Sequence, residues 1–342
     1  MKKIIISKDN ESKKLIRFLS AYFKEATTGF IYKMLRKKNI VLNDKKALGS
    51  ETLKEGDEIS IYFSDETLNK FIGDSKELDI SNTKKILDKN YIIYEDENII
   101  VINKPQGVLS QKSEEKDISI NEMALNYMLS NNEIDKESLS IFTPSIVNRL
   151  DRNTGGLIIF AKKYKIARKL SDMFSQSRID RYYITYSYNL GQNIFDDKDE
   201  FVVVSDYKKD EKNNIAILSN THIYDKNINT NDVLDEGKIA TKFKLLSKSD
   251  LYFVIEAMLY TGKSHQIRSQ LNDIGLPIIG EVKYINLSDS KIKNMKEKYF
   301  NKIKHQVLFS NKIVFGNFND EEFSYLNGKK FEIDYERLKL IT

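Results

Sequence analysis

The chain has 342 residues, of which 40% are hydrophobic and 31% charged. This length exceeds the need of one ordinary domain, so we expect two compact units, one large and one small. The hydrophobic content excludes wholesale disorder, and the absence of cysteine excludes disulfides, thiolate metal sites and cysteine nucleophiles. No apolar run approaches the roughly 18 residues that span a bilayer, and the N-terminus turns polar after three isoleucines. We therefore expect a cytosolic protein with neither a membrane span nor a secretion signal.

The net charge of +5 is concentrated near the N-terminus. Residues 1–64 contain fourteen Lys and Arg against eight Asp and Glu, a net charge of +6, whereas the other 278 residues carry −1. The spacing over 30–38 predicts a helix with Ile31, Met34 and Leu35 toward a core. Neighbouring faces of this helix carry Lys33, Arg36 and Lys37. From charge alone, a solvated helix face and a surface that contacts RNA are equally good interpretations.

The remaining pattern indicates an α+β fold. Strands are predicted over 39–44 and 53–62, and the polar stretch 65–88 predicts a linker. Further strands are predicted over 91–94, 99–102, 157–160, 182–188, 201–204, 215–218, 242–246 and 251–259. Helical spacing predicts helices over 119–129, 165–177, 264–274 and 288–300. Many strands without regular βαβ alternation favour a mixed, largely antiparallel sheet with flanking helices.

The sequence lacks the motifs of several common enzyme classes. Thr261-Gly-Lys-Ser264 resembles the end of a phosphate-binding loop, but position 257 is Ala where that loop needs its first Gly. No Gly-x-Gly-x-x-Gly follows a strand, and Gly-x-Ser-x-Gly is absent. The three histidines lie far apart in the sequence and outside any His-Glu-x-x-His, so we expect no metal site. Nucleotide hydrolysis, redox and serine-hydrolase chemistry are therefore disfavoured.

A polar turn lies between two apolar strands, within residues 145–160. Asp, Asn and Gly favour turns on backbone grounds, so a plain surface hairpin would explain it. Two features favour a function instead. Arg149 and Asp151 are two residues apart and would share one face if the strand continues through them. A carboxylate flanked by Arg149 and Arg152 would also stay ionised when partly buried, as a nucleophile or base at neutral pH must.

A second group of polar residues opens at a strand end, in residues 261–280. It predicts a helix that is stopped by Gly275 and whose inward stripe is Ile267, Leu271 and Ile274. Arg268 lies at the edge of this stripe, near the first turn. Arg268 is therefore either a solvent-facing arginine or a guanidinium held against a buried carboxylate by a charge-assisted pair.

Residues Asn148-Arg-Leu-Asp-Arg-Asn-Thr-Gly-Gly-Leu157 resemble the His-Arg-Leu-Asp-x-x-Thr-Ser-Gly-Leu signature of the RluA family of pseudouridine synthases. Three more stretches agree in order: Val101-Ile-Asn-Lys-Pro-Gln-Gly107, Arg181-Tyr-Tyr-Ile-Thr185 and Gly262-Lys-Ser-His-Gln-Ile-Arg268. Weaker echoes occur at Gly237-Lys-Ile-Ala-Thr241 and Lys304-His-Gln306. A sister family has Arg-Gln-Val-Arg where this chain has His265-Gln-Ile-Arg268, which favours the first family. Asn148 for His and Gly155 for Ser are departures from the signature.

The resemblance implies an enzyme that isomerises uridine to pseudouridine in RNA without a cofactor. It implies that Asp151 is the essential carboxylate, that Tyr183 stacks on the target base, that Arg268 is the partner of Asp151, and that Arg149 enters the RNA stack where the uridine has left. Further substrate contacts are expected from Asn148, Arg152, Thr154, His265, Gln266, Ile267, Lys33, Arg36 and Lys37.

The resemblance also divides the chain. Residues 1–64 resemble the small RNA-binding domain named after ribosomal protein S-four, 65–88 form the linker, and 89–342 form the catalytic domain of the pseudouridine synthase fold. This arrangement favours large-subunit ribosomal RNA as the partner and leaves transfer RNA open. We expect no membrane or metal partner, and a monomer.

Several alternatives stay open at this point. Asp151 either attacks the ribose or removes a proton from it. The departures at Asn148 and Gly155 support an RNA-binding or ribosome-assembly protein that kept the fold and lost the chemistry. A glycosidase would need a second carboxylate about 5 to 9 Å from Asp151, and no motif supplies one.

Overall fold

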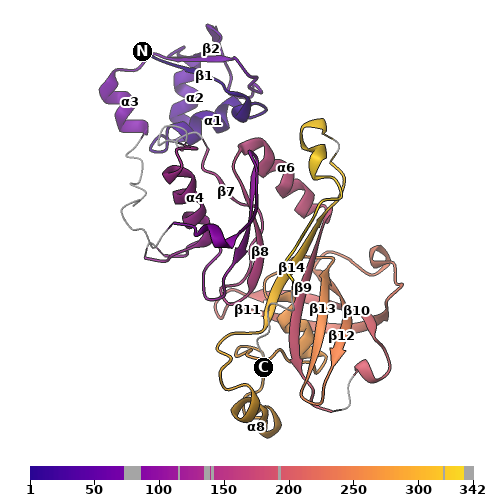
Figure 1. Cartoon of the computed structure of the whole chain (residues 1–342). Helices are drawn as coiled ribbons and strands as arrows, with labels where there is room; N and C mark the ends of the chain where they lie inside the picture. The colour runs from indigo at the N-terminus through magenta and orange to yellow at the C-terminus, as the bar shows by residue number, and fades with distance from the viewer. Residues whose placement is uncertain are drawn as a thin grey trace. The chain divides into compact units, whose positions relative to one another are not determined.

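The computed structural model describes residues 1–72, 86–114, 116–134, 139, 142–191, 194–318 and 320–334. The chain divides into two compact units (Figure 1). Unit 1 consists of Met1–Ile100, Ile118–Val147 and Ile159–Ser171, and unit 2 of Val101–Asp117, Asn148–Ile158 and Asp172–Thr342. The chain therefore crosses between the units several times, and the boundaries expected at 64 and 88 stay a prediction. Within the described ranges, no helix is both long and apolar enough to cross a bilayer.

The N-terminal part of unit 1 is a small antiparallel sheet with two helices. Its strands, in the order β1-β4-β2-β3, are β1 (Lys2–Ile5), β4 (Glu58–Ile61), β2 (Ile40–Leu42) and β3 (Lys45–Lys46). The helices are α1 (Leu15–Tyr22) and α2 (Thr28–Arg36). Helix α2 begins after Thr27, whose hydroxyl accepts a hydrogen bond from the Phe30 N–H at 3.2 Å. The predicted helix is confirmed, with Ile31, Met34 and Leu35 in the core and Lys33, Arg36 and Lys37 exposed.

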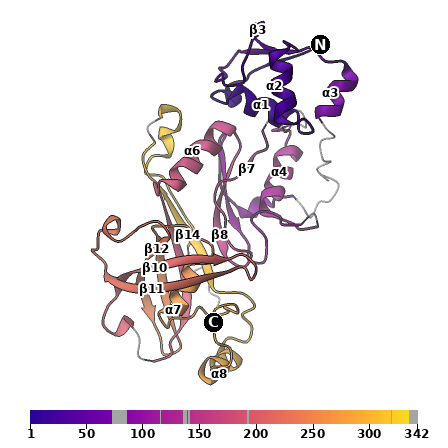
Figure 2. The same ribbon diagram turned by 180° about the vertical axis from the view of Figure 1, so that it is seen from behind.

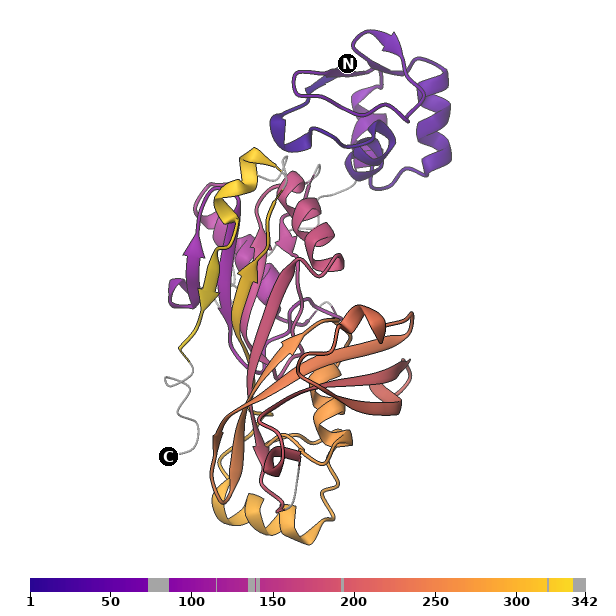
Figure 3. The same cartoon turned by 90° about the vertical axis from the view of Figure 1, so that its right-hand side faces the viewer.

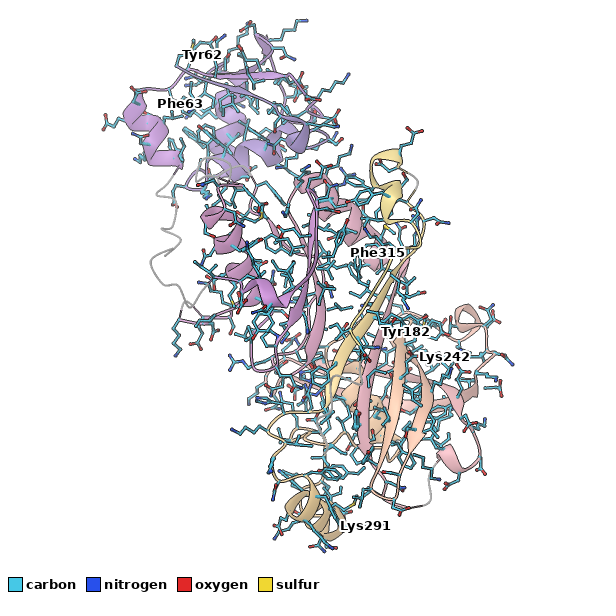
Figure 4. All side chains as sticks on the ribbon, in the orientation of Figure 1. Tyr62, Phe63, Tyr182, Lys242, Lys291 and Phe315 are labelled. Carbon is cyan, nitrogen blue, oxygen red and sulfur yellow. The ribbon has the colours of Figure 1, made fainter. Side chains whose placement is uncertain are left out.

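A third helix, α3 (Asp65–Ile72), occupies the first part of the expected linker. Its apolar residues Leu68, Phe71 and Ile72 pack against the core of the small sheet, at the i, i+3, i+4 spacing of one helix face. The rings of Phe71 and Phe30 lie 4.3 Å apart between centroids. Phe63, labelled in Figure 4, joins the same aromatic group. Residues 73–85 of the expected linker lie outside the described residues.

The rest of unit 1 contains α4 (Ile120–Ser130), β5 (Ile92–Glu95), β7 (Ser145–Ile146) and most of α6 (Tyr164–Ser175). Strands β6 (Ile99–Lys104) and β8 (Gly155–Ala161) begin in one unit and end in the other. Short 3₁₀ helices lie at Lys8–Asn10, Lys89–Tyr91, Ile194–Asp196, Thr230–Asp232 and Glu321–Leu326.

Unit 2 is built on a large twisted sheet (Figures 1 and 2). Its own strands are β9 (Ile179–Tyr188), β10 (Glu200–Asp210), β11 (Ile215–Asp225), β12 (Lys238–Lys248), β13 (Tyr252–Leu259), β14 (Leu308–Phe315) and β15 (Lys330–Glu332). The strand order is β11-β10-β12-β13-β9-β14-β8-β6-β5, with β15 beside β14 and β7 beside β8. Strands β8 and β14 run parallel, whereas β9 to β13 pair antiparallel. The expected mixed, largely antiparallel sheet is confirmed.

Two helices complete unit 2. Helix α7 (Gln266–Asp273) contacts β11, as Figure 2 shows, and starts after His265, which has a left-handed backbone with φ of 59°. Helix α8 (Ser290–Tyr299) starts at Asp289, whose carboxylate accepts hydrogen bonds from two N–H groups of its first turn. The predicted helices over 264–274 and 288–300 are confirmed.

Gly156 marks the closest approach of β8 to β14. A Cβ atom added there would lie 2.1 Å from the backbone oxygen of Ser310, and the φ of Gly156 is +107°. We expect Gly156→Ala to lower the free energy of unfolding by about 3 kcal/mol or more, because clash and backbone strain add. Gly237→Ala is the control: its φ is +87° but nothing lies within 4 Å, so it reports strain alone, about 1 kcal/mol. Equal losses in urea denaturation would contradict the close approach.

Candidate active site

Asp151 lies in the turn that leads into β8. Its side chain is 27% exposed, and its Oδ2 atom accepts a hydrogen bond from Arg268 Nη1 at 2.9 Å. The Thr154 N–H donates to the Asp151 carbonyl oxygen at 3.1 Å and closes the turn. Residues from two distant parts of the sequence thus form one charged pair, with the carboxylate still reachable from outside.

A second carboxylate fixes the other edge of the Arg268 guanidinium. Arg268 Nε donates to Glu281 Oε2 at 2.6 Å and Nη2 donates to Glu281 Oε1 at 2.9 Å, a bidentate pair. Both residues are buried, with exposed fractions of 7% and 2%. Burial alone would raise the pKa of Glu281, but the hydrogen bonds and charge of Arg268 lower it below its usual range. The pair therefore holds Arg268 charged and in one orientation toward Asp151.

His265 faces Asp151 from the start of α7. Its Nε2 atom lies 3.8 Å from Asp151 Oδ2, and its Nδ1 atom lies 2.7 Å from the Tyr284 hydroxyl. That hydroxyl accepts the Ala216 N–H at 2.7 Å, so its own proton is available to His265 Nδ1. Burial lowers the pKa of His265, as do the charges of Arg268 and Lys283, against the opposing effect of Asp151. The lowered pKa favours the neutral ring, and a proton donated by Tyr284 to Nδ1 would place the ring's own proton on Nε2.

Tyr183 lies in β9, near the centre of the sheet. It pairs with Ala257 of β13 on one side and with Ser310 of β14 on the other. Its side chain is buried, and burial raises the pKa of its hydroxyl, so the ring stays neutral. The sheet therefore holds a flat aromatic surface in a fixed position.

One pocket of unit 2 contains these groups. Asp151, Tyr183 and Arg268 line it together, and so do five of the residues expected to bind substrate: Arg149, Thr154, His265, Gln266 and Ile267. Its other lining residues, which the sequence did not single out, are Leu150, Leu259, Lys263 and Leu308. The pocket thus combines apolar walls with a carboxylate, an aromatic ring and several basic groups, all on one chain.

Five residues expected to bind substrate do not line this pocket. Asn148 donates from Nδ2 to the Leu157 carbonyl oxygen at 3.3 Å, and Arg152 is exposed, with Nη2 3.6 Å from Asp117 Oδ1. The three basic residues of α2 and its C-terminal end, Lys33, Arg36 and Lys37, are exposed in unit 1. The roles of all these residues stay predictions.

Lys104 is a supporting residue that the sequence did not single out. It is fully buried at the end of β6, and its Nζ atom donates to the carbonyl oxygens of Val108 at 2.7 Å and Arg152 at 3.1 Å. Burial lowers the pKa of Lys104 to about 8, although the charge of Asp151 opposes this shift. Because Arg152 follows Asp151 directly, Lys104 fixes the backbone of the turn.

Two glutamines hold the next residues of the turn. Gln106 Nε2 donates to the Asn153 carbonyl oxygen at 3.0 Å, and Gln306 Nε2 donates to the Thr154 hydroxyl at 2.8 Å. Both glutamines lie in stretches that resemble the family motifs, so that resemblance was a signal that could have found them. Side-chain hydrogen bonds therefore fix Arg152, Asn153 and Thr154, the three residues that follow Asp151.

This arrangement suits a carboxylate that acts on a ligand with a flat ring, which Tyr183 could stack on. A charged pair fixes Asp151, which can attack carbon or accept a proton. A glycosidase would need its second carboxyl group protonated, whereas the pKa of Glu281 is lowered and its oxygens are occupied. Within the described part of the chain, no group of three or more His, Asp and Glu residues could hold a metal ion.

Comparison with known proteins identifies relatives over most of the chain. The family model described as RNA pseudouridylate synthase matches residues 98–273. A protein of Rickettsia bellii named ribosomal large subunit pseudouridine synthase C is 35% identical over 280 residues, 80% of this chain and 83% of that protein. An uncharacterized RNA pseudouridine synthase of Mycoplasma capricolum is 31% identical over 289 residues, 83% of this chain and 85% of that protein.

Glu281→Gln tests the role of the second carboxylate. We expect it to lower the free energy of unfolding by about 3 kcal/mol, because it leaves a buried guanidinium with one anionic partner instead of two. Turnover should also fall, because Arg268 would lose the ionic partner that fixes its orientation toward Asp151. Glu58→Gln is the control: it removes one partner of the surface pair with Lys3, which solvent screens, and should cost far less. Similar losses in the two variants would contradict the buried pairing.

Proposed function

Because the chain belongs to the RNA pseudouridylate synthase family, we propose that its pocket isomerises uridines of large-subunit ribosomal RNA, with Asp151 as the essential carboxylate. The chain is an isomerase that acts on RNA, and the proposal names its target and its reacting residues. The observation that carries the proposal is the Asp151–Arg268 pair in a pocket that Tyr183 also lines.

The reaction moves a base on its own sugar. The bond from uracil N1 to the ribose breaks, the uracil rotates, and a bond forms from C5 to the same ribose carbon, while C5 loses a proton and N1 gains one. Nothing is oxidised and no group leaves. A side chain cannot reach these atoms inside a base stack, so the nucleotide must first leave it, at a cost of a few kcal/mol.

Each residue of the pocket has a separate role in this reaction. Stacking on the Tyr183 ring would return about 1 to 3 kcal/mol of the cost of extraction, and Arg149 would fill the space that the base leaves. Arg268 donates a hydrogen bond to Asp151 and would direct its carboxylate at the sugar. Asp151 then attacks the ribose or removes a proton from it. Retention of all three side chains in one pocket supports an active enzyme over an RNA-binding protein that has lost the chemistry.

The names of the relatives support the ribosomal target. Several are ribosomal large subunit pseudouridine synthases, and they align with about four fifths of this chain. We also propose that residues 1–64 form an RNA-binding domain of the S-four type, supported by its net charge and by the exposed basic residues of α2. We further propose that the protein acts in the cytoplasm and as a monomer.

Asp151→Asn tests the essential carboxylate and the target together. Cells whose gene carries this change should lose specific pseudouridines from large-subunit ribosomal RNA, and the purified variant should react about 100-fold or more slowly while it still binds RNA. Asp273→Asn, an exposed carboxylate on α7, is the control and should keep both activities. Unchanged pseudouridine maps would refute the assignment, and losses in transfer RNA alone would refute the ribosomal target.

Neutralising α2 tests the N-terminal surface. We expect the triple change Lys33→Gln, Arg36→Gln and Lys37→Gln to weaken RNA binding. It should also reduce the slope of log affinity against log salt by about 2 to 3, because RNA binding releases fewer counterions when three phosphate contacts are lost. A control with the same charge change uses Lys3→Gln, Lys24→Gln and Lys54→Gln. An equal effect of both triples would show that net charge matters and α2 does not.

A further inference from the structure

A second basic segment lies in unit 2. Residues 282–305 contain seven lysines against two acidic residues, a net charge of +5. Since residues 65–342 carry −1 in total, the rest of that part of the chain sums to −6. The small net charge of residues 65–342 is therefore the sum of a positive segment that contains α8 and a negative remainder.

Both ends of this basic segment are anchored at the pocket. It begins directly after Glu281, which holds Arg268, and ends directly before Gln306, which holds the Thr154 hydroxyl. All of these residues belong to unit 2, as does the pocket. Both ends of the segment are therefore tied to residues that line the pocket.

Helix α8 presents its lysines outward. Ile292 and Met295 are buried against a core that includes Tyr188, and Phe300 ends the helix in the same core. The exposed lysines of the basic segment are Lys283, Lys291, Lys293, Lys298, Lys302 and Lys304. Figure 3 shows α8 at the edge of unit 2, and Figure 4 labels Lys291 on it. Packing of Ile292 and Met295 thus leaves the lysines of α8 on the two flanks of the buried face.

The protein itself does not neutralise most of these charges. Among the described residues, Lys293, Lys296, Lys302 and Lys304 make no ion pair. Lys291 is directed onto the Leu190 carbonyl oxygen and Lys283 onto the Asn214 carbonyl oxygen. Like charges held this close repel one another, and an anion brought from outside relieves that repulsion.

We propose that the basic segment 282–305 binds the phosphate backbone of the RNA beside the uridine held in the pocket. This inference rests on the proposed function, because a flipped uridine carries its flanking phosphates to the rim of the same pocket. RNA fits better than an acidic protein, because the pocket of the same unit is proposed to hold a uridine of that RNA and lysines without an ion pair can each bind one of its phosphates. Such contacts position the RNA and do not choose the uridine.

Neutralising two lysines tests the proposal. The change Lys293→Gln with Lys302→Gln should reduce the slope of log affinity against log salt by about 1.4 to 1.8 for a uridine-bearing RNA stem-loop, as expected for two lost phosphate contacts. The control is Lys226→Gln with Lys244→Gln, two exposed lysines of unit 2 outside the basic segment, and should leave the slope unchanged. Replacing Lys293 and Lys302 by arginine should restore it.

The outcomes separate this inference from the proposed function. If the slope of the Lys293→Gln, Lys302→Gln variant stays at the wild-type value while the stem-loop is still converted, the basic segment does not touch RNA and the inference is wrong. An equal reduction by the control pair would also overturn it, because net charge alone would then explain the effect. Failure of the wild-type protein to form pseudouridine in any RNA would instead contradict the proposed function.

Discussion

A buried guanidinium shared by two carboxylates is the interaction on which the site depends. Arg268 has little contact with water, so its charge is tolerable only because Glu281 binds it through two hydrogen bonds and Asp151 through a third. The two carboxylates differ in what they can do. Glu281 is enclosed and its oxygens are occupied, whereas Asp151 keeps one oxygen and part of its surface free. Glu281 thus holds the arginine, and the arginine holds Asp151, which we propose as the reacting carboxylate.

Side-chain hydrogen bonds also fix the turn that carries Asp151. Lys104 and Gln106 bind successive carbonyl oxygens of the turn, Gln306 binds the Thr154 hydroxyl, and Gly156 lets β8 approach β14 more closely than any side chain would allow. A reacting group works only if its neighbours fix it within a fraction of an ångström. Much of unit 2, including the strand pair that the glycine permits, therefore serves to place one carboxylate against one arginine.

The sequence predicted the parts of this structure that have a local signal. Strands rich in β-branched residues, the helix stripe of Ile267 and Leu271, and the fold class are all observed, because periodicity and composition report burial directly. Strand β14 was not predicted, since Ser310 and Asn311 interrupt its apolar pattern and are buried only because strands lie on both sides. The sequence predicts no helix where α3 lies, because its apolar residues are few. Glu281 is a lone acid after an apolar run, and only tertiary contact shows its role.

We propose two kinds of RNA contact: a pocket that takes one extracted base, and basic surfaces that hold the backbone. The most direct test of the account is a structure of the protein bound to an RNA whose target uridine is replaced by a slowly reacting analogue. The account predicts an extruded base against Tyr183, its ribose at the Asp151 carboxylate, and Arg268 still bridging Asp151 and Glu281. A base that remains stacked in the RNA, or a ribose bound away from Asp151, would contradict it.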